Sequence, residues 1–155
     1  MKFSVVTALT TLLASGAMAA PADVDARGVA TVSMTAAAVW TIEGMKRSCD
    51  KPDNKCAWSF TINNNAGSKQ GCSYTVKRQG SHTPASRSPQ TGVDCGVYTV
   101  TSGWSGQFGE GNGFTTLSVV NNKDRTIAWP AYTDKQLKGG KVVSPNQSYP
   151  VQNLP

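Results

Sequence analysis

Few residues in this 155-residue chain could carry acid–base or nucleophilic chemistry. It has one histidine, His82, and two glutamates, Glu43 and Glu110. A Ser–His–Asp triad needs a base held within hydrogen-bond reach of its nucleophile, but His82 lies in a turn-rich segment, residues 79–84. A glycosidase needs two facing carboxyl groups, which only a Glu43/Glu110 pair would supply readily. We therefore predict no catalytic residue, with a small hydrolase using Glu43 or Glu110 as a minor alternative.

Two glycine-containing motifs come close to known site motifs without matching them. Ser105 lies in the sequence GWSGQ, where the nucleophile elbow of hydrolases would require glycine at position 107 and a helix after it. The run GEGNG at residues 109–113 lacks the spacing of a dinucleotide-binding loop, and a strand is expected after it. We therefore predict a surface loop over residues 103–113 and no cofactor.

The four cysteines are Cys49, Cys56, Cys72 and Cys95. An even number of cysteines in a short exported chain is typical of disulfides. Zinc sites usually contain close cysteine pairs together with histidines, whereas six, fifteen and twenty-two residues separate these cysteines. The sequence predicts two disulfides and no metal site.

Three disulfide pairings are possible, and the sequence does not decide between them. We prefer Cys49–Cys56 with Cys72–Cys95 because of proximity along the chain. Cys49 ends one β-like segment and Cys56 begins the next, so this bridge would join adjacent strand ends. The second bridge would close the polar loop at residues 80–92.

The N-terminus predicts export. Lys2 precedes an apolar run at residues 5–14, and the small residues of Ala17-Met18-Ala19 fit the signal peptidase rule. The run is shorter than the roughly 20 residues that span a bilayer. We predict a signal peptide at residues 1–19, a flexible arm at 20–35, and a single domain at 36–155 that is secreted as a monomer.

The segments that must position these residues are short and β-like. Cys56, Trp58, Phe60 and Ile62 alternate with small polar residues, so they share one face of a strand. Residues 56–77 predict a hairpin, with further strands at 37–45, 95–101, 114–120, 125–129 and 148–154, and one helical turn at 134–138. Seven short strands favour an all-β fold, a small antiparallel barrel or sandwich. The four tryptophans are core candidates: Trp40, Trp58, Trp104 and Trp129.

The chain carries a formal charge of +6, and its basic residues are dispersed along the sequence. The simplest interpretation is a solvated surface, with attraction to acidic polymers such as wall pectins as an alternative. Nothing predicts specific nucleic-acid recognition. Trp104 or Tyr132 could stack on sugars if the protein bound a cell-wall polysaccharide, although core packing is the favoured role for both. Asn146 begins an N-glycosylation sequon, Asn-Gln-Ser.

Several segments resemble a known family. They are residues 39–44 (VWTIEG), 58–62 (WSFTI), 98–108 (YTVTSGWSGQF), 130–134 (PAYTD) and 139–143 (GGKVV). Together with Cys49 and Cys56 they are similar to small secreted elicitors of plant-pathogenic fungi that induce the hypersensitive response, most of all to the rice blast member. The resemblance implies a non-catalytic apoplastic protein that a plant cell-surface receptor or other apoplastic target perceives. It implies no catalytic residue. Because loops carry recognition on β scaffolds, we expect residues 80–92 and 103–113 to make the contacts.

Overall fold

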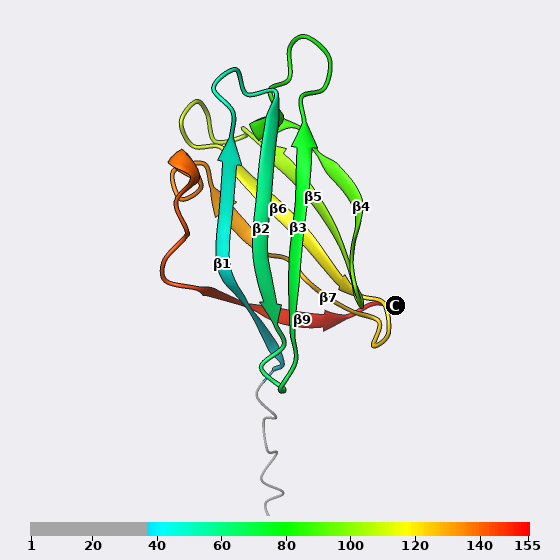
Figure 1. The fold of residues 1–155 in the computed structure, drawn as a ribbon. Helices are drawn as coiled ribbons and strands as arrows, with labels where there is room; N and C mark the ends of the chain where they lie inside the picture. The colour runs from blue at the N-terminus through cyan, green and yellow to red at the C-terminus, as the bar shows by residue number, and fades with distance from the viewer. Residues whose placement is uncertain (1–36) are drawn as a thin grey trace, which may run out of the picture. The chain divides into compact units, whose positions relative to one another are not determined.

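The computed structural model describes residues 37–155. The predicted signal peptide (residues 1–19) and arm (residues 20–35) lie outside the described residues. Within 37–155 the fold is all-β, as predicted, and no helix there is long and apolar enough to cross a bilayer. Nine strands are present rather than the seven expected (Figure 1): β1 (Val39–Cys49), β2 (Lys55–Asn63), β3 (Lys69–Lys77), β4 (Gln90–Cys95), β5 (Tyr98–Ser105), β6 (Phe114–Asn121), β7 (Thr126–Ala128), β8 (Ala131–Thr133) and β9 (Gln147–Asn153).

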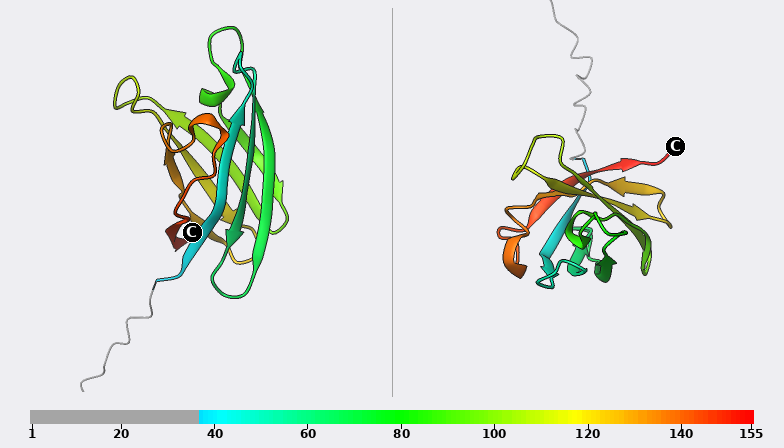
Figure 2. Two further views of the ribbon diagram at one scale, coloured as in Figure 1. Left: turned by 60° about the vertical axis from the view of Figure 1, so that its left-hand side comes forward. Right: turned by 90° about the horizontal axis from the view of Figure 1, so that it is seen from above.

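The strands form one antiparallel sheet that curls into a nearly closed barrel. The strand order is β3-β2-β1-β9-β7-β6-β5-β4, and β8 pairs with β6 beside β7. Seen from above in Figure 2, the strands curve around a shared interior. The architecture is therefore the barrel form of the predicted fold class.

Both predicted disulfides are confirmed. Cys49 and Cys56 are directly opposed at the paired ends of β1 and β2. Cys72 of β3 bonds Cys95 of β4, and these two strands are the ends of the sheet order. The second bridge thus joins the two edges that no backbone ladder closes. Exposed edges are a liability for β proteins, so the disulfide acts where the barrel is least protected.

The alternation that predicted a hairpin at residues 56–77 also builds the core. Along β2 the cysteine and the large apolar residues are buried, and the residues between them face outward or are partly covered. β2 pairs with β3 along its whole length, from Lys55 opposite Lys77 to Asn63 opposite Lys69. Trp40 and Trp58 lie in the core as expected, and Trp40 meets the ring of Tyr98 edge to face.

Three expectations from the sequence are wrong in detail. The strand predicted at residues 95–101 is divided, because Cys95 and Tyr98 face each other across a turn in which Gly96 has φ +71°. The helical turn predicted at 134–138 is instead a turn followed by a 3-10 helix at Lys138–Gly140 (η2). Trp129 is 50% exposed. It lies between the buried Ala128 and Pro130, so the period of two turns its side chain away from the core.

Four segments gather at one end of the barrel, the upper end in Figure 1. We call this the loop end and define it as residues 46–55, 77–89, 106–113 and 134–141. It comprises the strand ends and the connections after β1, β3, β5 and β8, including the 3-10 helices η1 (Ala85–Arg87) and η2. The opposite end carries the short turns at residues 64–68, 96–97 and 122–125.

Candidate functional site

The two loops that the sequence singled out lie side by side at the loop end. Arg87 of the first loop places its guanidinium carbon 4.8 Å from the centre of the ring of Trp104, which lies on β5 two residues before the second loop. A guanidinium over an indole face is favourable because the ring face is electron-rich. The contact joins segments that are separated by most of β4 and β5.

Asp134, at the end of β8, connects three parts of this end. One carboxylate oxygen accepts a hydrogen bond from the Trp104 indole N–H at 2.9 Å. The other lies 3.2 Å from Nη1 of Arg47, on β1, in a hydrogen-bonded ion pair. The Asp134 backbone N–H also donates to the carbonyl of Gly113. The side chain thus joins the end of β8 to β1 and β5, and the backbone of the same residue joins it to the 106–113 loop.

Arg47 is an unusual feature, because it is a charged residue with only 7% of its surface exposed. Its Nη1 also donates to the Ser86 carbonyl at 3.1 Å, and its guanidinium lies over the Trp58 ring at 5.6 Å. Its Nε has no partner among the described residues. Buried charges are normally paired, so Arg47 depends on Asp134.

The 78–89 loop is held against the β1–β2 connection by Asp53. This carboxylate accepts hydrogen bonds from the backbone N–H and the hydroxyl of Ser86, and its backbone carbonyl accepts from Ala85. The segment predicted as a polar loop therefore has a fixed base. Its tip, which carries His82, is exposed.

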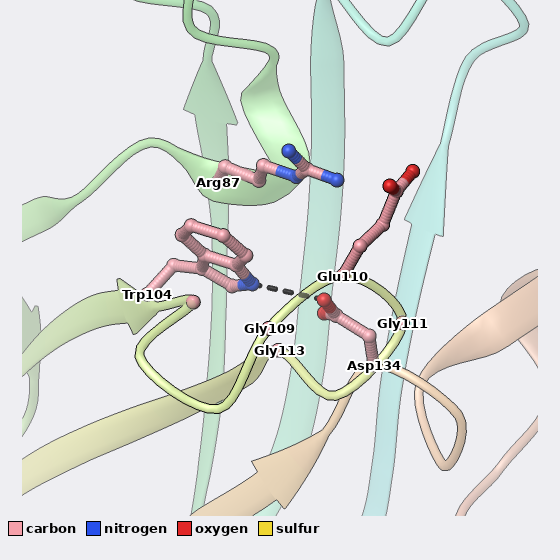
Figure 3. A pocket seen from close by; sticks show the side chains of 8 residues that line it. Arg87, Trp104, Gly109, Glu110, Gly111, Gly113 and Asp134 are labelled. Carbon is pink, nitrogen blue, oxygen red and sulfur yellow. Dashed lines mark hydrogen bonds between the residues drawn. The ribbon is translucent and has the colours of Figure 1, made fainter.

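A cavity of about 720 Å³ opens between these loops (Figure 3). Arg87 and Trp104 form one wall, and Glu110 and Asp134 another; the remainder is glycine, Gly106, Gly109, Gly111 and Gly113. Two of these glycines, Gly106 and Gly113, are needed for close approach. A Cβ on Gly113 would lie 2.7 Å from the Trp104 ring, and one on Gly106 would lie 2.5 Å from it.

A second cavity, of about 480 Å³, shares Arg87 and Asp134 with the first. Arg47, Lys138 and the Asp53–Ser86 pair contribute to its lining. The two cavities together form a polar hollow in which three basic side chains, Arg47, Arg87 and Lys138, face an equal number of carboxylates. Such a hollow suits a charged, hydroxyl-rich ligand better than an apolar one.

The two residues proposed for sugar stacking, Trp104 and Tyr132, differ in how deeply they are buried. Trp104 is partly buried, with Arg87 over its ring. Tyr132 is 1% exposed, and its ring meets Tyr149 edge to face. It contributes to the wall of a small apolar cavity with Phe108 and Phe114. Ligand contact at Trp104 or Tyr132 stays a prediction, and stacking on Tyr132 would require the ring to become exposed.

The candidate catalytic residues are not assembled into a reactive group. Glu43, on β1, is bonded to Asn63 and Lys69 toward the opposite end of the barrel, whereas Glu110 is in the 106–113 loop. These bonds, the one to Lys69 foremost, hold the pKa of Glu43 below its ordinary value. The carboxylate is thus stabilised as an anion. His82 donates to and accepts from no side chain of the described residues.

The described residues include one group with metal-ligand geometry, Cys49, Asp53 and Cys56. Both of its sulfurs are in a disulfide and so offer no thiolate. Asn146, the predicted glycosylation site, is exposed, and its side-chain oxygen accepts from the Gly44 N–H. Glycan attachment there stays a prediction.

Sequence reasoning missed Arg47, Arg87 and Asp134 as a group. Arg47 and Asp134 are 87 residues apart, and each stands among ordinary surface-type residues in the sequence. No local pattern reports a contact of that range. The nearest signal in the sequence is the glycine-rich run at residues 109–113, which predicts only a loop.

Two comparisons with known proteins identify relatives. The family model described as Effector TSP1 matches residues 41–154, which is nearly all of the described barrel. A protein of Hypocrea virens (strain Gv29-8 / FGSC 10586) named Effector TSP1 is 45% identical over 146 residues, which covers 94% of each chain. The likeness to the rice blast elicitor stays a prediction. With this match along the whole barrel, the chain belongs to the Effector TSP1 family.

Proposed function

We propose that this chain is a secreted, non-catalytic fungal effector that plant cells perceive, and that perception produces defence and hypersensitive cell death. It acts as a monomer in the host apoplast, on a cell-surface receptor or another apoplastic target. Family membership supports the effector role. The predicted signal peptide and the two disulfides suit an extracellular protein.

The observation that carries the proposal is the construction of the loop end. The Asp53–Ser86 bonds fix the 78–89 loop, and the bond from the Asp134 N–H to the Gly113 carbonyl fixes the end of the 106–113 loop. Both loops stand on a barrel with both disulfides formed. Recognition by a partner costs less entropy when the contacting loops are already ordered. The loops therefore present a defined shape, and no chemistry is required of them.

Loop exchange in purified protein tests this assignment. One variant replaces residues 107–112 and another residues 79–83 with glycine–serine sequence of equal length. A control replaces residues 64–68, the β2–β3 turn at the opposite end. All are infiltrated into leaves at equal concentration after circular dichroism has confirmed the β fold. We expect the protein concentration needed to cause cell death to rise at least tenfold for the loop variants and to stay unchanged for the control. Full activity in both loop variants would contradict the proposal.

The hydrolase alternative has its own test. The protein is incubated with wall polysaccharides, and the release of reducing sugar ends is measured for the wild type, Glu43→Gln and Glu110→Gln. We expect no turnover in any sample and an intact plant response for Glu43→Gln. Turnover by the wild type that either substitution abolishes would establish an enzyme instead.

A further inference from the structure

The charge of this protein is concentrated at one end of the barrel. The loop end holds ten Lys and Arg against four Asp and Glu, whereas the rest of residues 37–155 holds three of each. The net charge of the described chain therefore lies at the loop end. The ten basic residues are Lys46, Arg47, Lys51, Lys55, Lys77, Arg78, Arg87, Lys135, Lys138 and Lys141. Sequence order hides this, because the residues come from four separate segments.

Nine of these ten cations have no ion-pair partner among the described residues. The two ion pairs found there are Arg47–Asp134 and, away from the loop end, Lys69–Glu43. Lys55 and Lys77 are directly opposed on β2 and β3, and both are exposed. Like charges at directly opposed positions destabilise a sheet. An anionic partner would relieve that repulsion, and within the described chain nothing does.

Arg87 is the cation best placed to act as an anchor. Its guanidinium is fixed over Trp104 and makes no hydrogen bond or ion pair within residues 37–155, yet it lines both cavities. The buried Arg47 beside it also has an unpartnered Nε and lines the second cavity. A planar guanidinium held in place suits a carboxylate, which it can bind through two parallel hydrogen bonds.

The remaining cavity wall indicates which kind of anion fits. Glu110 and Asp134 lie opposite the guanidinium (Figure 3), and carboxylates accept hydrogen bonds from hydroxyl groups but repel dense negative charge. A uronate sugar offers both a carboxylate for Arg87 and hydroxyls for these acids. A nucleic acid strand would rely on open aromatic faces for stacking, whereas Arg87 covers the Trp104 ring. The observations therefore favour an acidic polysaccharide over a phosphate polymer.

We propose that the loop end binds a polyuronate. The carboxylate of one sugar binds Arg87, and the surrounding lysines contact other carboxylates of the polymer. Further carboxylates of the polymer would meet other cations of the loop end, such as Lys138 at the second cavity and the opposed Lys55 and Lys77. This binding is independent of whether a plant receptor perceives the protein. It would concentrate the protein on an anionic matrix by the ordinary effect of opposite charge.

The test uses the mature protein and two forms of one polymer, polygalacturonate and its fully methyl-esterified form, by titration calorimetry. Esterification removes the charge and leaves the sugar backbone. We expect binding to the free acid, loss of at least tenfold in affinity on esterification, and weakening as salt is raised. Single-stranded DNA and anionic phospholipid vesicles are titrated in parallel. Equal affinity for the esterified polymer, or tighter binding to DNA or vesicles, would overturn the proposal.

Variants locate the site. Arg87→Gln should weaken binding about tenfold, because it removes charge-assisted hydrogen bonds. Arg87→Lys should recover only part of this affinity, because lysine cannot bind a carboxylate in a bidentate manner. The Lys55→Gln, Lys77→Gln double variant should also bind more weakly while remaining folded. Lys123→Gln, which removes one exposed charge from the opposite end, is the matched control and should bind as the wild type does. Equal losses for Arg87→Gln and Lys123→Gln would refute the assignment.

Leaf infiltration with the same variants separates this proposal from the proposed function. If polyuronate binding is absent but cell death persists, the polyuronate site is wrong and the effector role stands. If binding is found but no plant response occurs, the effector role fails and the site stands.

Discussion

Removing the negative charge of Asp134 should destabilise the barrel more than its partial exposure suggests. In Asp134→Asn, Arg47 keeps its positive charge in a site that is only 7% exposed, where no carboxylate balances it and the Ser86 carbonyl and the Trp58 ring remain as neutral partners. Removing one partner from a buried ion pair costs about 3–5 kcal/mol. Asp134 is 29% exposed, so solvent screens part of the loss, while a weakened hydrogen bond to Trp104 adds up to about 1 kcal/mol. We expect the free energy of unfolding to fall by about 2–3 kcal/mol.

The assay is urea denaturation followed by far-ultraviolet circular dichroism, and the summed fluorescence of the four tryptophans, Trp104 among them, provides a second probe of the same transition. The matched control is Glu110→Gln, which removes one negative charge from the same end at an exposed residue without hydrogen bonds among the described residues. Its free energy of unfolding should change by no more than about 0.5 kcal/mol.

A double-mutant cycle isolates the pair itself. Arg47→Met replaces the charge by an apolar chain that can still pack on Trp58, and replacement of buried ion pairs by apolar groups is often tolerated. In the Arg47→Met background, Asp134→Asn should cost about 1–2 kcal/mol less than it does alone. Equal costs in both backgrounds, or a cost for Asp134→Asn no larger than for Glu110→Gln, would refute the view that Asp134 compensates a buried charge.

Three further predictions concern the scaffold. Replacing both cysteines of the Cys72–Cys95 bridge by serine should lower the free energy of unfolding by about 3 kcal/mol, and replacing both cysteines of Cys49–Cys56 should lower it by about 2 kcal/mol. The first bridge stabilises more because it closes a loop of 23 residues rather than 7. Equal losses in chemical denaturation would contradict this reasoning from loop entropy. Gly113→Ala should cost about 1–3 kcal/mol, since its Cβ would meet a ring and a carboxylate, whereas Gly103→Ala, with open space around it, should be nearly neutral in thermal unfolding. Burial raises the pKa of Tyr74 to about 12, so its contribution to stability is complete below the ordinary value near 10 and is lost as pH rises toward 12. Between pH 9 and pH 12 the free energy of unfolding of Tyr74→Phe should therefore fall by about 2 kcal/mol less than that of the wild type. Identical pH profiles of the two proteins would show that Tyr74 does not cause the loss of stability.

The sequence predicted the strands whose two faces differ most. β2 alternates large apolar residues with small polar ones, so its burial pattern follows directly from the period of two. The same reasoning failed at residues 95–101, because the turn between Cys95 and Tyr98 has β-favouring residues on both sides and its single signal is Gly96. Trp129 was misassigned to the core since hydrophobicity alone does not say to which side a residue at the end of a strand points.

The candidate site was predictable only in its parts. The two loops follow from their glycine, proline and serine content. The predicted bounds, 80–92 and 103–113, are each three residues too long, because β4 begins at Gln90 and β5 continues to Ser105. The adjacency of the loops depends on the order in which the strands curl around the barrel. Arg87 reaches Trp104, and Arg47 reaches Asp134, across contacts that no local periodicity encodes. The charge polarity was invisible for the same reason, because antiparallel connections bring every second loop to one end.

This topology explains how a small chain can combine a rigid scaffold with a strongly cationic surface. Ten cations at one end repel each other, and that repulsion weakens folding. The strand pairing and the core along the rest of the barrel offset this repulsion, and the one cation of the ten that is buried, Arg47, has its own carboxylate. The exposed cations therefore need no internal partner for the barrel to fold. They remain free to bind an external anion, which is why the positive charge of the loop end is better understood as a property of binding than of stability.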